Sequence, residues 1–163
     1  MGADLMPPPA DSPAAAPSFA VWAARDPGSR RKAGTQLQRV QIIKGWVEDG
    51  DAREAVYDVV GLPPGEARVD VATCEQSGAG ADSLCGVWVD PDFDPDEHAF
   101  YYARVLENPS CRWSAHACNT LGVDCADDGS ADRKLFKLCC GADRPRAIQE
   151  RAWSSPIWYT PAD

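Results

Sequence analysis

Residues 85–113 read CGVWVDPDFDPDEHAFYYARVLENPSCRW, and this stretch decides the fold. A β-branched run around Trp88 is followed by four aspartates and two prolines, and a second aromatic and β-branched run begins at Phe100. This order predicts two strands joined by an acidic turn. In two-sheet sandwiches a tyrosine beside such a turn often ties the corner through its hydroxyl. Tyr101 and Tyr102 are the candidates for that role.

Further strand-like runs lie on both sides of this stretch. Two of them, residues 37–47 and 56–60, predict a hairpin with a longer loop, and the imperfect alternation of the first predicts a bulge near Ile42 and Ile43. Short strands separated by turns, without a sustained helical period, predict an all-β fold, an antiparallel β-sandwich of immunoglobulin-like type. The remaining strand-like runs are residues 19–24, 68–74 and 148–159, the last with Pro156 at an edge or bulge.

The length of 163 residues predicts one domain with a preceding tail. Residues 1–18 are rich in proline and alanine and predict an extended linker. Residues 19–163 form the expected sandwich domain. Within it the strand pattern dissolves over residues 111–147, which predict an irregular, Cys-rich insertion held by disulfides. Residues 133–138 alone suggest a helical turn or a short strand there.

Charge and hydropathy narrow the classes of partner. The formal net charge of -9 and the pI near 4.6 argue against nucleic acid and against an anionic membrane surface, because both need a basic field. No apolar run approaches the roughly 20 residues of a membrane span. Residues 1–17 lack the features of a secretory signal peptide. Small molecules, sugars, cations and other proteins remain as partners.

Seven cysteines without a C-x-x-C pair favour disulfides over structural zinc. Disulfides in turn imply an oxidising compartment. Cys74 and Cys85 stand at the ends of a glycine-rich loop, and a bridge between them would stabilise the fold by roughly 2–3 kcal/mol. The other five cysteines then leave one thiol over, in a pairing that the sequence does not fix. These five are Cys111, Cys118, Cys125, Cys139 and Cys140.

The acidic turn carries a weak candidate for calcium. Its alternate carboxylates resemble the start of a calcium-binding loop, but Pro95 stands where such a loop needs glycine and Tyr101 where it needs a bidentate glutamate. We therefore favour a solvated turn, with a weak structural calcium site as the alternative. The candidate ligands are Asp90, Asp92, Asp94 and Asp96.

The two histidines, His98 and His116, are too few for a multinuclear metal centre. His116 suggests a zinc site as an alternative to disulfides, although the spacing is looser than structural zinc usually shows. No G-x-S-x-G, phosphate loop or H-E-x-x-H is present, and we assign no catalytic residue. The ligands of that zinc site would be Cys111, His116, Cys118 and Cys125.

Six tryptophans offer stacking surfaces for a sugar, although most lie in strand runs where a large ring usually serves the core. The sharpest short signature is Lys44-Gly45-Trp46. Its glycine allows close approach of another backbone, and Lys44 and Trp46 are candidates for an active-site rim or an anion contact. A strand bulge beside a salt-bridged lysine explains the same residues.

Four blocks of sequence carry a resemblance to a known family. The chain resembles the C-terminal part of the bacterial domain of unknown function 3604 family, whose members look like relatives of PHP-type metal-dependent phosphoesterases. Those members are usually several times longer and often exported, with their metal-binding histidines in an N-terminal barrel-like region. The matching blocks are QRVQIIKGWVEDG (38–50), VWVDPDFDP (87–95), AFYYARVLENPSCRW (99–113) and IQERAWSSPIWY (148–159).

The resemblance implies that this chain is the C-terminal accessory sandwich of a periplasmic or extracellular PHP-like hydrolase. Its partner would be the N-terminal catalytic barrel of the same protein, and divalent metal would bind there, with no cofactor in this segment. The alternative is a stand-alone module that binds carbohydrate or protein through exposed tryptophans.

Overall fold

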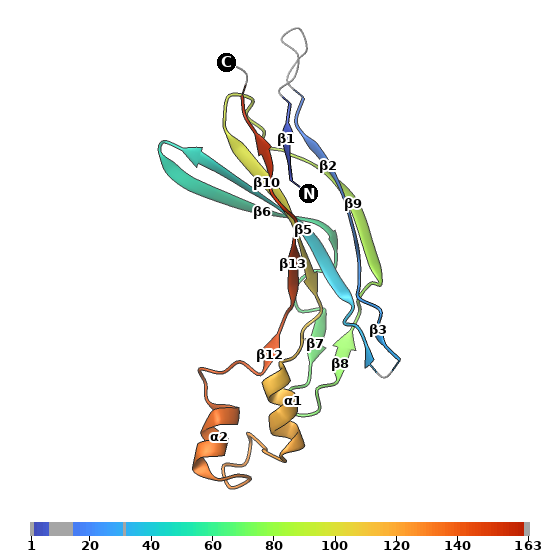
Figure 1. Cartoon of the computed structure of the whole chain (residues 1–163), viewed down its shortest axis with the longest axis vertical. Helices are drawn as coiled ribbons and strands as arrows, with labels where there is room; N and C mark the ends of the chain where they lie inside the picture. Colours follow the sequence, from blue (N-terminus) through green and yellow to red (C-terminus); the bar gives the residue numbers. More distant parts are fainter. Residues whose placement is uncertain (1, 7–14, 31, 162–163) are drawn as a thin grey trace.

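Figure 1 shows a computed structural model of the chain, which describes residues 2–6, 15–30 and 32–161. Its largest unit is a six-stranded sheet with the order β1-β14-β10-β5-β6, in which β13 also pairs with β10. β1 runs parallel to β14, and the other pairings in this sheet are antiparallel. Its strands are β1 (Ala3–Leu5), β5 (Leu37–Glu48), β6 (Asp51–Gly61), β10 (Ala99–Glu107), β13 (Arg151–Trp153) and β14 (Ile157–Tyr159).

A two-stranded ribbon of β2 (Ser18–Ala24) and β9 (Ser83–Val89) packs against one face of this sheet (Figure 1). Residues along both strands alternate between buried and exposed, because successive side chains of a strand point to opposite faces. The predicted all-β class is confirmed, while the immunoglobulin-like form stays a prediction. The apolar core between ribbon and sheet contains Phe19, Ile42, Ala99, Tyr101 and Tyr159 as its buried members.

The β5–β6 hairpin is tighter than the sequence analysis predicts. Its turn consists of Asp49 and Gly50 alone, with φ angles of 53° and 83°. Positive φ at both positions is the signature of a two-residue turn, for which Asp-Gly is a favoured pair. The predicted longer loop was therefore wrong. The register shift lies between Val40 and Gln41, two residues before the predicted bulge.

The run at residues 148–159 divides where the sequence places Pro156. β13 pairs with the distal half of β10 and β14 with its first residues, and Pro156 lies between them. Within the predicted linker, Ala3–Leu5 form β1 beside β14, whereas residues 7–14 lie outside the described part. β1 pairs there because β14 otherwise leaves an unpaired edge.

Three short two-stranded ladders surround the main sheet, and two of them lead towards the Cys-rich lobe, the name we give to residues 111–147 (Figure 1). They are β3 (Gly28–Ser29) with β4 (Lys32–Ala33), β7 (Ala67–Val69) with β8 (Gln76–Gly78), and β11 (Ser110–Cys111) with β12 (Ala147–Ile148).

The Cys-rich lobe contains two helices where the sequence analysis predicts irregular structure. The helical turn suggested at residues 133–138 belongs to α2 (Arg133–Cys140), and Asp132 caps it by accepting bonds from two backbone N–H groups. α1 (Trp113–Thr120) was not predicted, because it lacks a side-chain cap and a clear apolar period. Neither helix among the described residues is long and apolar enough to cross a membrane.

Three disulfides tie the lobe together and to the segment between β7 and β8. Cys74 bonds to Cys111, so the predicted Cys74–Cys85 bridge was wrong. Cys85 is the free, exposed thiol, because it lies on the outward face of β9 opposite Trp22, away from the end of β7. The leftover thiol therefore lies outside the five later cysteines. The other two bridges are Cys118–Cys139 and Cys125–Cys140.

Candidate functional site

A network of polar side chains lies between the ribbon and the sheet, with Lys44, Asp90 and Tyr101 buried and Asp92 exposed. The Lys44 ammonium lies 2.8 Å from the Asp90 carboxylate, and the side chains are only 3% and 0% exposed. Lys44 Nζ also donates to the backbone oxygen of Asp92 at 2.7 Å, and the Tyr101 hydroxyl donates to Asp90 at 2.7 Å. The Tyr57 hydroxyl donates to the Asp92 carboxylate at 3.0 Å. The network thus fastens the acidic turn to β5, β6 and β10.

The two tyrosines of this network remain protonated donors. Burial, followed by the hydrogen bond to Asp92, raises the pKa of Tyr57 to about 12. Burial and the bond to Asp90 raise the pKa of Tyr101 well above its ordinary value. Loss of either proton would place a phenolate beside a carboxylate, and the repulsion between like charges makes this unfavourable. The buried members Lys44, Asp90 and Tyr101 bind one another.

The two residues predicted for a rim or an anion contact lie close together, with the Lys44 ammonium 5.4 Å from the centroid of the Trp46 ring. Lys44 is 2% exposed and meets an anion of its own chain, Asp90, so it does not lie at a rim. Of the two explanations of Lys44, a salt-bridged lysine agrees with the structure and an anion contact at a rim does not. Trp46 is partly buried and lines a surface cavity of about 440 Å³.

The four aspartates proposed for calcium have different partners. Asp90 is engaged by Lys44 and Tyr101, and Asp94 accepts a bond from the backbone N–H of Asp96 at 2.9 Å. The hydroxyl that bonds backbone near this turn belongs to Tyr159, which donates to the oxygen of Pro95 at 2.8 Å. The predicted role of Tyr101 or Tyr102 at the corner is therefore filled by another tyrosine, while Tyr101 bonds a carboxylate.

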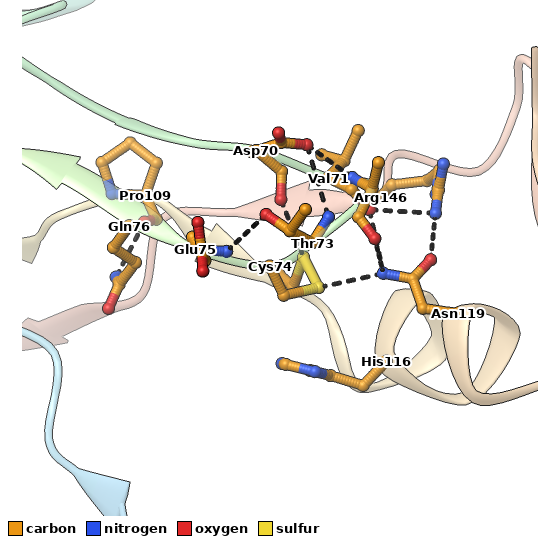
Figure 2. The surroundings of a disulfide bond; sticks show 12 residues. Asp70, Val71, Thr73, Cys74, Glu75, Gln76, Pro109, His116, Asn119 and Arg146 are labelled. Atoms are coloured by element: carbon orange, nitrogen blue, oxygen red, sulfur yellow. Dashed lines mark hydrogen bonds between the residues drawn. A yellow bond between two sulfur atoms is a disulfide. The ribbon is translucent and has the colours of Figure 1, made fainter.

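Within the described residues, one group of three side chains has ligand atoms close enough to hold a metal ion: Cys74, Cys111 and His116. Figure 2 shows His116 beside the bridge, with the Asn119 amide donating to the sulfur of Cys74. The two sulfurs are joined to each other, and zinc needs thiolates. The suggested zinc site with Cys118 and Cys125 does not form, because both of these bond to other cysteines.

The outer face of the sheet, away from the ribbon, carries an aromatic groove, which we define by Phe100, Tyr102, Trp153 and Trp158. The rings of Phe100 and Tyr102 are stacked with centroids 6.3 Å apart, and those of Phe100 and Trp158 are tilted at 5.3 Å. Trp153 and Trp158 are 58% and 51% exposed. Gly45 makes room for this arrangement, because a Cβ there would lie 2.3 Å from the Phe100 ring.

Two surface cavities, of about 310 and 440 Å³, meet at Phe100 and Trp158 in this groove. Aromatic rings and polar side chains together line these cavities. Such a mixture of apolar faces and polar groups is typical of sites for small organic ligands. The polar residues lining the two cavities are Arg53, Glu54, His98, Ser154 and Thr160.

The outward face of the ribbon is the second exposed apolar surface, and we call it the ribbon face. Trp22, Val87 and Val89 are 72%, 68% and 52% exposed. In a chain of net charge -9, this row contains no charged side chain. The ribbon face consists of the outward residues Ser18, Ala20, Trp22 and Ala24 of β2 and Ser83, Cys85, Val87 and Val89 of β9.

These features define a disulfide-bonded, all-β protein with exposed apolar side chains on both its sheet and its ribbon and a polar network between these layers. The chain belongs to the family described as protein of unknown function (DUF3604), whose model matches residues 1–161. This match confirms the family that the sequence resembles. No curated protein and no solved structure matches the chain. The three disulfides indicate an oxidising environment.

Proposed function

We propose that this chain is the C-terminal accessory domain of a PHP-like metal-dependent hydrolase, without catalytic activity of its own. In this proposal the catalytic barrel precedes the segment in the full protein and holds the divalent metals. The protein acts in the periplasm or outside the cell. The accessory domain packs against the barrel and contributes polar side chains to the rim of its active site.

The ribbon face is the observation that carries this proposal. Exposed apolar rows without charge are rare on soluble proteins and mark surfaces that another protein region covers. The absence of charge in this row matters because a charged group buried without a partner would oppose docking. A free thiol at Cys85 also fits a covered surface, since exposed thiols in oxidising compartments react. Membership of the family and the resemblance to longer hydrolases support the same role.

Two experiments test the proposal. The first assays the isolated chain with manganese or zinc on chromogenic phosphate esters, and we expect no turnover above buffer. The second produces the barrel from the reading frame upstream of Met1 and measures its binding to this chain by calorimetry. Trp22→Asp should abolish binding, whereas Trp153→Asp, an exposed tryptophan on the opposite face, should preserve it. Turnover by the isolated chain, or an effect of Trp153→Asp alone, would contradict the proposal.

The aromatic groove favours a second candidate function, binding of carbohydrate. Sugars present apolar faces that stack on aromatic rings, with hydroxyls that bond to polar groups at the margin. Trp153 and Trp158 would supply the stacking surface. Intrinsic fluorescence titrated with a panel of glycans tests this role, with Trp153→Ala and Trp158→Ala removing the response and Trp22→Ala retaining it. A flat response to every glycan excludes it.

A further inference from the structure

A separate cavity lies in the Cys-rich lobe and is lined by residues of α1 and α2. Figure 1 shows these two helices at the lower end of the molecule. Its volume is about 340 Å³, within the range of small-molecule sites. Its apolar lining includes Trp113, Leu121 and Leu138, which are 79%, 64% and 53% exposed. Three large apolar side chains left open to water around one hollow indicate a surface that an apolar ligand would cover.

The same cavity is lined by three arginines, Arg112, Arg144 and Arg146. Asp143 is the one carboxylate among its lining residues, and it lies 4.0 Å from the Arg144 Nε with both side chains largely exposed. Such an exposed pair is worth little, so Arg144 remains available to a ligand. Arg112 has no ion pair among the described residues. The cavity is thus locally cationic in a chain whose formal charge is -9.

Two of these arginines, Arg112 and Arg146, are neighbours in the backbone at the start of α1. The backbone N–H of Arg112 donates to the oxygen of Arg146 at 2.9 Å, which places the start of α1 beside the segment that follows α2. Arg146 is fixed by bonds to Val71 and Asn119 (Figure 2), and its buried Nε has no hydrogen-bond partner among the described residues. Leu121 lies at the opposite end of α1. The cavity therefore offers both cationic and apolar side chains to a ligand.

The beginning of α1 adds hydrogen-bond donors to the lining of the cavity. Its first residue follows Arg112, whose side chain makes no capping bond, whereas Asp132 caps α2 with two. The first N–H groups of a helix lack intrahelical partners and attract anions together with the helix dipole. Trp113 and Ser114, which carry two of these groups, both line the cavity.

We propose that this cavity binds an amphipathic carboxylate, a small acid that carries a short acyl chain or an aryl ring. The carboxylate lies against Arg112, Arg144 and the start of α1, because guanidinium groups match carboxylates in charge and in fork geometry. The apolar part lies against Leu121, Leu135 and Leu138. The acidic surface elsewhere on the chain disfavours competing anion sites. This role is independent of barrel docking and of carbohydrate binding.

Calorimetry with octanoate, octanol and octylammonium as probes tests the proposal on the whole chain. Octanoate should bind saturably at one site, octanol roughly tenfold more weakly, and octylammonium not measurably, because only octanoate offers a carboxylate to the arginines. Arg112→Gln/Arg144→Gln should weaken octanoate about tenfold and leave octanol unchanged. Leu138→Ser should weaken octanoate and octanol alike. Arg68→Gln, an exposed arginine of β7 that lines neither this cavity nor the aromatic groove, is the matched control and should bind octanoate as the unaltered chain does.

Three outcomes would overturn the proposal: equal affinity for octanoate and octanol, unchanged octanoate binding in the double arginine variant, or no saturable binding below the micelle concentration. Binding of the chain to vesicles of anionic lipid is measured as a further comparison. Binding to vesicles without binding of free octanoate would also overturn it. The variant Arg112→Lys/Arg144→Lys keeps both positive charges and controls for misfolding of the glutamine variant. It should restore part of the octanoate affinity that the glutamine variant loses.

Discussion

The main sheet with its ribbon and the Cys-rich lobe are stabilised in opposite ways. Between sheet and ribbon, the buried hydrophobic residues come from four strands, and the layers also contain an ion pair whose members are almost fully buried. In the lobe, the buried cluster consists of Val123 and two disulfide-bonded cysteines, Cys118 and Cys139. A segment with so few buried apolar side chains needs covalent links to restrict its unfolded state.

This difference bears on function. The aromatic groove on the sheet and the ribbon face on β2 and β9 lie on a framework fixed by the core between them, as a stacking or docking surface requires. The cavity of the lobe lies between two short helices joined by Cys118–Cys139, so its shape depends on that bridge. Variants that affect one region and spare the other therefore test the comparison.

The largest effect is expected at the buried ion pair. Lys44→Met would leave the Asp90 carboxylate buried without its cation, and such changes cost about 3–5 kcal/mol of unfolding free energy. Urea unfolding followed by tryptophan fluorescence measures the loss. Arg53→Met breaks an exposed pair with Glu48 and should cost less than about 1 kcal/mol. Similar losses of unfolding free energy in the two variants would show that the buried pair stabilises the fold no more than the exposed pair does.

The next effect should be confined to the lobe. Cys118→Ala/Cys139→Ala opens a bridge with a sequence separation of 21, worth about 3 kcal/mol in the loop-entropy model. Hydrogen exchange should accelerate in α1 and α2 and stay unchanged in β5. Cys85→Ala, which removes the free exposed thiol, is the control. It should leave hydrogen exchange unchanged both in the two helices and in β5. Loss of protection throughout β5 would mean that the two regions are not separately stabilised.

A smaller effect is expected where the sheet supports the aromatic groove. Gly45→Ala would place a methyl group 2.3 Å from the Phe100 ring, and overpacking of this kind costs about 1–3 kcal/mol. Thermal unfolding measures the loss, and ligand-free tryptophan fluorescence reports the shift of Trp158. Adding Phe100→Leu should recover part of the stability, because a smaller side chain relieves the contact. An unchanged Tm in Gly45→Ala would contradict the tight packing of Phe100 on Gly45.

The smallest effect concerns pH. The pKa of Tyr57 is raised to about 12 in the folded chain, whereas an unfolded tyrosine ionises near about 10. A raised folded pKa means that the folded state holds its proton more tightly, so this contribution is complete below pH of about 10 and is lost as the pH rises towards 12. Urea midpoints across this interval should fall more steeply for the unaltered chain than for Tyr57→Phe. Equal slopes would show that Tyr57 does not couple to folding.

Local patterns predicted much of the sheet. The alternation around Trp88 and the run from Phe100 correctly indicated β9 and β10, and Pro156 marked the break between β13 and β14. The tight β5–β6 turn was also readable, since Asp49-Gly50 is a favoured pair for it. Helix α2 was predicted only in part, as a helical turn or a short strand at residues 133–138. Helix α1 was missed because its sequence has neither a cap nor an amphipathic period.

The candidate sites were harder to predict because they depend on side chains distant in sequence. Lys44 and Asp90 are 46 positions apart in the numbering, and nothing local distinguishes a lysine that faces solvent from one that meets a carboxylate across the core. The aromatic groove unites Phe100 with Trp153 and Trp158 through strand register. The cavity of the lobe joins Arg112 and Arg144 only once α1 and α2 pack.

The amino-acid sequence by itself determined the β class, the family and the oxidising setting, because strand periodicity, sequence blocks and cysteine number are properties of neighbouring or counted residues. Tertiary structure alone decided which cysteines pair, which rings are exposed, and that Lys44 is enclosed with Asp90. Those outcomes depend on distances across strand pairs and between layers, and such distances are set by the packing of the whole chain.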